Sequence, residues 1–281
     1  NNLQAAKKLY KEILKTNPNF AGAHNNLGNV LHELGQFKKA VSCYEKAIQI
    51  QPNYTNAHYN LGSVLHELGQ FKKAVSCYEK AIQIQPDYAN AHYNLGLIFK
   101  ELGEFQKAVS CYEKAIQINP NFAGAHNNLG NVLHELGEFQ KAISCCKKAI
   151  QINPNFAGTH NNLGLIFKEL GEFQKAMGCY EKAIQIQPNF VDAHNNLGAV
   201  YFELGEHQKA MGCYKKVIQI EPNNLTSHWL SMNTFPIIYK NLNEIDMYRK
   251  KFEDDTKKIN HLLDTQYQYT KKQIVDAMKS S

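Results

Sequence analysis

The 281-residue chain lacks the features that would place it in several common classes of protein. It has no long apolar run, because Asn, Lys, Glu or His interrupts each apolar stretch within a few residues, so we expect no membrane-spanning segment and no membrane partner. Its first residues contain no apolar signal segment. It also has no run of basic residues: the formal net charge of +6 is spread along the chain, so we expect no nucleic-acid partner.

Sequence motifs of enzymes are missing as well. The chain contains no GxGxxG, no GxxxxGK, no HExxH and no candidate Ser–His–Asp arrangement. Twelve histidines suggest a metal at first sight, but seven of them recur every 34 residues and therefore cannot converge on one ion. Packing, or hydrogen bonds between repeats, explains them better. We expect no catalytic residue, no metal site and no cofactor. The equivalent histidines are His24, His58, His92, His126, His160, His194 and His228.

The seven cysteines do not indicate disulfides. Six of them occupy one position of a repeated pattern, and equivalent atoms of stacked helices lie roughly 10 Å apart, which is too far for an S–S bond. Cys146 follows Cys145 on the same helix and points elsewhere. Reduced thiols in a cytoplasmic protein are the interpretation we adopt. The six equivalent cysteines are Cys43, Cys77, Cys111, Cys145, Cys179 and Cys213.

Internal repetition is what the sequence has in abundance. Alanines, glycines and prolines recur every 34 residues from before residue 20 to near residue 222. A chain made of one repeated unit predicts a solenoid, which usually functions by presenting a long surface rather than a catalytic pocket. The recurring glycines are Gly28, Gly62, Gly96, Gly130, Gly164 and Gly198.

Each repeat is predicted to form two helices. Apolar residues recur at helical spacing in both halves of the unit 21–54, and Gly35 stands where a left-handed residue would end the first helix. Gly28 and Ala40 are expected to let the two backbones approach closely. Tyr44 and Ala47 are then expected to fill the space against the next unit.

This pattern resembles the tetratricopeptide repeat, and it is carried by Leu27, Gly28, Leu31, Ala40, Tyr44, Ala47 and Pro52. The resemblance implies an all-α, helix–turn–helix solenoid: a right-handed superhelix with a concave groove lined mainly by first helices. His24 and its equivalents stand where this family often has Trp. We expect the second helix of a truncated repeat in 1–20, six full repeats in 21–222 and a degenerate repeat with capping and linker helices in 223–281. The repeats start at residues 21, 55, 89, 123, 157 and 191.

A row of asparagines is the candidate binding site. Helical phase places these side chains on the open face, and a carboxamide can pair with both the C=O and the N–H of an extended peptide. The alternative is that the amides only tie neighbouring turns together. Two tyrosines next to the row could stack on ligand side chains or be plain surface aromatics. The predicted groove residues are Asn26, Asn60, Asn94, Asn128, Asn162 and Asn196, with Tyr59, Tyr93, Asn127 and Asn161 beside them.

The end of the chain departs from the period. Ser231 and Met232 replace the Leu–Gly pair, and Pro236 breaks the next helix. A longer amphipathic helix is expected at 242–263, with Ile245, Tyr248 and Phe252 on its apolar face, and a shorter helix at 270–279. The segment 235–252 resembles the junction that follows the repeats in bacterial SPINDLY-like O-linked glycosyltransferases.

The resemblance implies that this chain is a fragment of a longer protein, in which it would select protein substrates for a sugar-transferring domain. The chain itself is expected to be non-catalytic. The alternative is a stand-alone adaptor in a multiprotein complex. Self-association through the near-identical repeats is a third interpretation.

Overall fold

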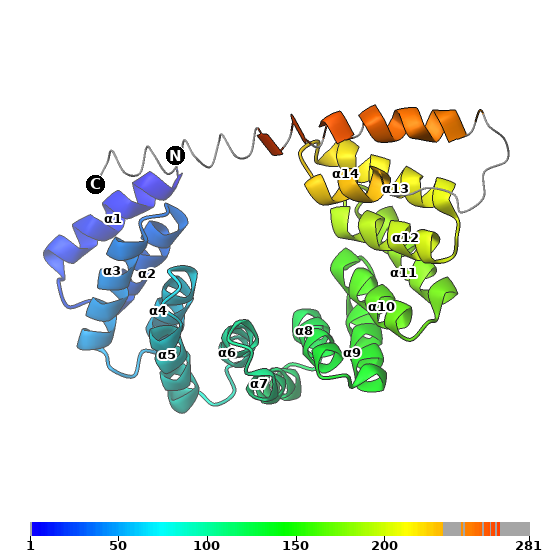
Figure 1. The fold of residues 1–281 in the computed structure, drawn as a ribbon. Helices are drawn as coiled ribbons and strands as arrows, with labels where there is room; N and C mark the ends of the chain where they lie inside the picture. Colours follow the sequence, from blue (N-terminus) through cyan, green and yellow to red (C-terminus); the bar gives the residue numbers. More distant parts are fainter. Residues whose placement is uncertain are drawn as a thin grey trace. The chain divides into compact units, whose positions relative to one another are not determined.

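The computed structural model describes residues 2–232, 243, 245–254, 256–258, 260–261 and 263–264. The chain divides into two compact units, Asn1–Ile152 and Asn153–Ser281, called unit 1 and unit 2 below. Every regular element in the described residues is an α-helix. The predicted all-α class is thereby confirmed (Figure 1).

Unit 1 consists of an initial helix followed by four helix pairs. Its helices are α1 (Asn2–Thr16), α2 (Ala21–Glu33), α3 (Phe37–Ile50), α4 (Thr55–Glu67), α5 (Phe71–Ile84), α6 (Ala89–Glu101), α7 (Phe105–Ile118), α8 (Ala123–Glu135) and α9 (Phe139–Ile152). The first helix of each pair begins where the 34-residue period begins a new unit.

Unit 2 continues with two further pairs and a shorter helix. These are α10 (Ala157–Glu169), α11 (Phe173–Ile186), α12 (Val191–Glu203), α13 (His207–Ile220) and α14 (Leu225–Met232). Additional helical residues follow at 245–254.

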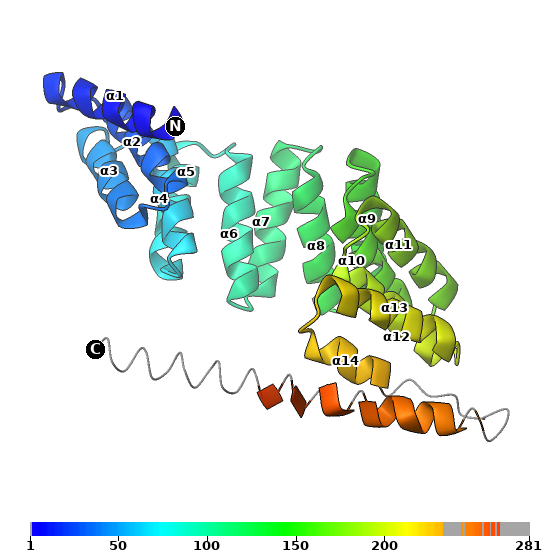
Figure 2. The ribbon, with the colours of Figure 1, turned by 90° about the horizontal axis from the view of Figure 1, so that it is seen from above.

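The helices of each unit form two layers. Within each unit, the second helix of a repeat packs against its own first helix and against the first helix of the next repeat of that unit. Successive first helices also contact one another, α2 with α4 and α4 with α6 in unit 1, and α10 with α12 in unit 2. In Figure 1, α6 and α8 lie toward the inside of the curve of unit 1, and Figure 2 shows α6, α7 and α8 side by side. The first helices therefore form one continuous layer within each unit.

A glycine ends each first helix, as predicted. Gly35 has φ +68°, and its five equivalents lie between +69° and +75°, a region that side chains with a Cβ rarely adopt. The Gly35 N–H donates to the His32 carbonyl at 2.8 Å, and the Gln36 N–H donates to Leu31 at 2.8 Å. This pair of bonds satisfies the last carbonyls of the helix, so the chain can turn directly into the second helix.

The recurring glycine Gly28 makes room for the tyrosine ring of its own repeat. A Cβ at Gly28 would lie 2.5 Å from the ring of Tyr44, which is 1 % exposed. At the equivalent Gly130, a Cβ would lie 3.3 Å from the Ala142 carbonyl of the second helix, in line with the predicted close approach of backbones. In the fourth full repeat Cys146 replaces the tyrosine, and a Cβ at Gly130 would lie 2.8 Å from its Sγ.

Residues of the C-terminal segment cover the end of unit 2. Tyr248 is buried, and its hydroxyl accepts a hydrogen bond from Gln208 of α13 at 2.6 Å. Lys251 donates to the Ser231 carbonyl at 2.5 Å. Ile245 and Phe252, predicted on the same apolar face as Tyr248, are 38 % and 43 % exposed.

Other predictions for the C-terminal segment fall outside the described residues. These include the break at Pro236, most of the junction before residue 245 and the helix at 270–279. Within the described residues, no helix is both long and apolar enough to cross a bilayer.

Candidate functional site

The histidine series is explained by a recurring hydrogen bond. Nε2 of His24 lies 2.8 Å from the Pro18 carbonyl, and all six equivalents make the same contact at 2.8 to 3.1 Å. A carbonyl only accepts, so Nε2 carries the proton. The histidine ring therefore ties the first helix of each repeat to the proline that precedes it. Burial lowers the pKa of His92, which favours its neutral form.

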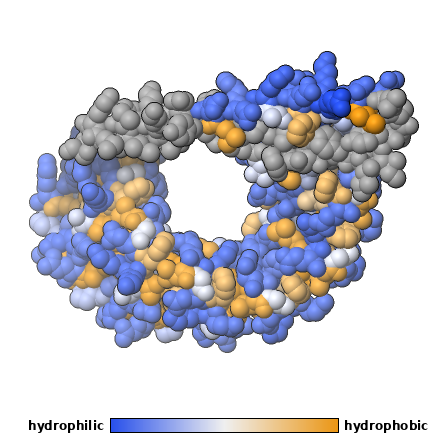
Figure 3. All heavy atoms as spheres, viewed as in Figure 1, coloured by the Kyte–Doolittle hydropathy of each residue, from blue (hydrophilic) through white to orange (hydrophobic). Residues whose placement is uncertain are grey.

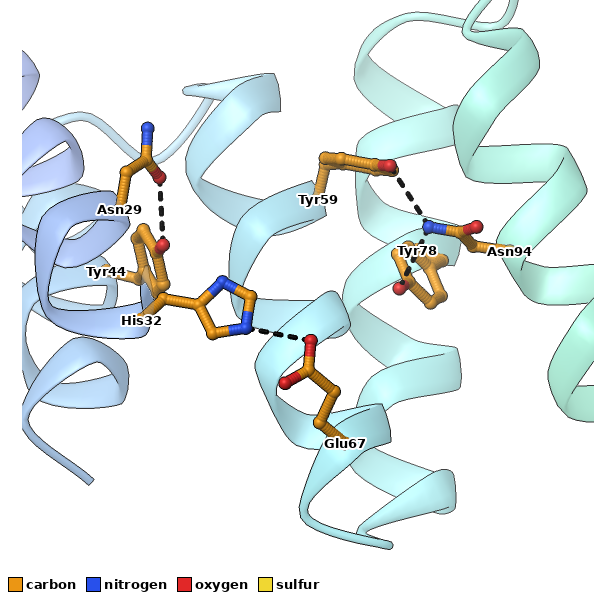
Figure 4. A network of polar contacts seen from close by, with 7 residues as sticks. All are labelled: Asn29, His32, Tyr44, Tyr59, Glu67, Tyr78 and Asn94. Atoms are coloured by element: carbon orange, nitrogen blue, oxygen red, sulfur yellow. Dashed lines mark hydrogen bonds and ion pairs between the residues drawn. The ribbon is translucent and has the colours of Figure 1, made fainter. Parts of the chain in front are cut away.

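The predicted asparagine row joins successive first helices. The Asn60 amide donates both of its hydrogens, to Oδ1 of Asn25 and to Oδ1 of Asn29, each at 3.0 Å. The Asn94 amide likewise donates to the hydroxyls of Tyr59 at 3.1 Å and Tyr78 at 3.3 Å (Figure 4). All four acceptors belong to the preceding repeat, so these donors are engaged within the protein.

The same pattern holds further along the chain. Asn128 donates to the Tyr93 hydroxyl at 2.9 Å, and Asn196 donates to Asn161 Oδ1 at 3.0 Å. Asn26, in the first full repeat, instead accepts from Asn25 at 3.2 Å. All six members of the row are half-buried, Asn162 included. The contacts favour the interpretation that the amide hydrogens tie repeats together, and they leave the carbonyl oxygens of Asn60 and Asn94 without a donor among the described residues.

The four residues predicted beside the row lie in the interface between repeats. The Tyr59 ring packs on Tyr88 at a centroid distance of 5.0 Å, and the Tyr93 ring packs on Phe122 at 4.7 Å. Burial raises the pKa of both phenols, Tyr59 and Tyr93. The corresponding residues Asn127 and Asn161 are 7 % and 5 % exposed. These four positions were predicted on the open face: Tyr59 and Tyr93 are half-buried there, whereas Asn127 and Asn161 are buried, which corrects their placement.

A polar hollow opens between α2 and α4. It has a volume of about 230 Å³ and is lined by Asn29, His32, Glu33, Tyr44, Asn60 and Ser63. The Tyr44 hydroxyl donates to Asn29 Oδ1 at 2.8 Å at its base (Figure 4). In the described parts of Figure 3, hydrophilic residues separate the apolar patches. The hollow is thus a polar recess directly beside the asparagine row.

Contacts between repeats also join the ends of first helices. Nε2 of His32 lies 2.8 Å from the Glu67 carboxylate, and Lys168 pairs with Glu203 at 2.8 Å. The partners in each pair are 35 residues apart, so each contact joins two successive repeats. The sequence contains a pattern that could have predicted these contacts, because a His or Lys is followed 35 residues later by Glu in five consecutive repeats.

The cysteines are free thiols, and the structure predicts that they react slowly. Burial, with the nearby Glu45 carboxylate as a smaller cause, raises the pKa of Cys77 to about 11, and burial likewise raises the pKa of Cys111 to about 11. Because the thiolate is the nucleophile, alkylation at neutral pH should be roughly a hundredfold slower than for an ordinary thiol.

Mass spectrometry after iodoacetamide treatment at increasing pH measures this prediction. The rate should keep rising about tenfold per pH unit well beyond the ordinary thiol pKa. The guanidinium-denatured chain serves as the control. A native rate that levels off at the same pH as the denatured one would contradict the prediction.

Helix pairs that stack in two layers over successive 34-residue units define a helical-repeat protein. Among the described residues, no group of three or more His, Cys, Asp or Glu side chains could hold a metal ion. Family models described as "TPR repeat" match residues 28–69, 62–103, 96–137 and 164–205. Models described as "Tetratricopeptide repeat" match 123–156 and 191–224, and 9–42 and 145–177. The chain belongs to the tetratricopeptide repeat family. Proteins of this fold generally mediate protein–protein interactions.

Solved structures support the same fold. YrrB, described as a TPR protein with an unusual peptide-binding site, is 24 % identical over 66 % of this chain and 95 % of its own, with a TM-score of 0.56. MamA is 28 % identical over 59 % of this chain and 97 % of its own, with a TM-score of 0.54. Cut9, in the APC/C hetero-tetramer Cut9–Hcn1, is 17 % identical over 83 % of this chain and 46 % of its own, with a TM-score of 0.68. No curated protein matches the chain.

Proposed function

We propose that this chain binds an extended polypeptide along its layer of first helices. The observation that carries the proposal is the polar hollow between α2 and α4, which the asparagine row borders. The family membership supports a protein or peptide as the ligand.

The geometry suggests how a peptide would be held. Asn60 and Asn94 use their amide hydrogens inside the protein, so their carbonyl oxygens are the groups left for a ligand. A peptide N–H is a donor and would fit such an acceptor. The acceptors on Asn60 and Asn94 would hold backbone groups largely independently of the ligand's sequence. This mode differs from the predicted one, in which each amide would both donate to and accept from the peptide.

The finer assignments remain proposals. The O-glycosyltransferase parent was predicted from a resemblance at 235–252, and half of that segment lies outside the described residues. A stand-alone adaptor uses the same surface and is equally consistent with the fold. The cytoplasmic location also stays a prediction.

Filling the hollow tests the proposal. The double variant Asn29→Leu/Ser63→Leu introduces a side chain that the array already carries at the equivalent positions Leu97 and Leu165, so folding should persist. Two leucines would occupy the recess, remove the polar groups of Asn29 and Ser63, and block access to the Asn60 carbonyl oxygen. We expect the affinity for an unstructured peptide, measured by fluorescence anisotropy, to fall about tenfold, which corresponds to roughly one lost hydrogen bond.

The matched control places the same side chain on the other layer. Gln49→Leu on α3 changes an exposed residue outside the hollow and should leave the affinity unchanged. Circular dichroism would verify that both variants remain helical. Equal affinities for the double variant and the unmodified chain would overturn the proposed function.

A further inference from the structure

Charge is divided between the two helix layers. In unit 1 the first helices α2, α4 and α8 each carry one Glu and no Lys or Arg, and α6 carries one Glu and one Lys. In unit 2, α10 carries one of each, while α12 carries one Asp and one Glu. The first-helix layer is therefore acidic, although the whole chain has a formal net charge of +6.

The second helices have the opposite sign. Helices α3 and α5 each carry three Lys and one Glu, α7 and α11 carry two Lys and one Glu, and α9 and α13 carry three Lys and no acidic residue. The excess of positive charge in the composition thus lies on the layer away from the asparagine row. A net charge for the whole chain conceals this division.

The hollow between α2 and α4 shows the same preference at the level of atoms. Glu33 lines it, is exposed, and forms no ion pair with another described residue. Asn60 Oδ1 accepts no hydrogen bond in the described part of the chain. The one ring that could carry positive charge, His32, already contacts the Glu67 carboxylate. The recess therefore offers acceptors and a carboxylate.

Lysine and arginine side chains carry donors and no acceptors. They complement a hollow that presents the Glu33 carboxylate and the Asn60 carbonyl oxygen. From this complementarity we infer that the first-helix layer selects extended peptides rich in Lys and Arg. The inference rests on the proposed peptide-binding function and adds the class of ligand.

Two labelled peptides of equal length test the inference with the full chain. One alternates Ser with Lys and the other alternates Ser with Glu. We expect the Lys peptide to bind at least about tenfold more tightly in low salt, and its advantage to shrink as salt screens the charges. Equal binding of both peptides would overturn the inference and leave the proposed function standing. Binding of neither would contradict the proposed function itself.

Charge variants locate the effect. Glu33→Gln and Glu135→Gln remove exposed carboxylates from first helices, and each should weaken binding of the Lys peptide about threefold. The control Glu45→Gln removes the same charge from an exposed position on α3 and should have no effect. If Glu45→Gln weakened binding as much as Glu33→Gln, the preference would reflect overall charge, and the assignment to the first-helix layer would be wrong. Tighter binding of the Glu peptide would instead indicate that the lysine-rich second helices form the binding surface.

Discussion

Replacing Gly164 with Ala is expected to destabilise unit 2 by about 2 kcal/mol, because a new Cβ would overpack the core. That Cβ would lie 2.6 Å from the ring of Tyr180, which is fully buried and has no room to move away. The clash should outweigh the gain of roughly 1 kcal/mol that Ala normally brings to a helix interior. Urea unfolding followed by far-UV circular dichroism measures the change.

Gly178 supplies the matched control on α11 of the same unit. No atom lies within 4 Å of a Cβ built there, so only the helix propensity should change. Gly178→Ala is expected to stabilise the protein by roughly 1 kcal/mol. Opposite signs for the two substitutions would support the ring-accommodating role of Gly164. Stabilisation by both would show that the glycine is not needed for the tyrosine.

Replacing Asn94 with Ala is expected to destabilise unit 1 by about 2 kcal/mol, because two hydrogen bonds between repeats would be lost. The Asn94 amide is the donor to Tyr59 and Tyr78, and Tyr78 is fully buried. The hydroxyl of Tyr78 would then be left in the interior without this donor. This expectation differs from the one that follows if the row only contacts ligand, in which case stability would hardly change.

The control for this substitution lies one turn earlier on the same helix. Asn90 is exposed on α6 and makes no hydrogen bond with another described residue, so Asn90→Ala should change stability by less than about 0.5 kcal/mol. Thermal unfolding of both variants is the measurement. Similar unfolding midpoints for Asn94→Ala and Asn90→Ala would contradict the idea that the asparagine row stabilises the protein through hydrogen bonds between repeats.

The sequence predicts the fold through local rules. Gly35 and its equivalents end their helices because only a left-handed residue satisfies the last carbonyls, and this depends on a few adjacent residues. Because these residues recur every 34 positions, each first helix ends in the same way. Helix phase likewise predicts which side chains leave the core, as it does for the half-buried Asn94.

Sequence reasoning could not resolve contacts between repeats. Tyr59 and Asn127 occupy equivalent positions next to the row, and helix phase alone exposes both of them. How far neighbouring residues cover them depends on how each first helix is shifted against the next, which sets contacts such as that of Tyr59 with Asn94. Helix phase also could not show that a ring fills the space at Gly28, because that ring lies 16 residues further along the chain.

Equivalent side chains form the interface between each pair of neighbouring repeats within a unit. This similarity has a consequence for how the number of repeats can change. If residues 55–88 were absent, Asn25 would face Asn94 where Tyr59 now stands. Asn25 Oδ1 already accepts an amide hydrogen from Asn60 in the same geometry. Whole repeats can thus be gained or lost by recombination while the contacts between neighbouring repeats stay the same. The length of peptide bound in the proposed function would then change in steps of one repeat.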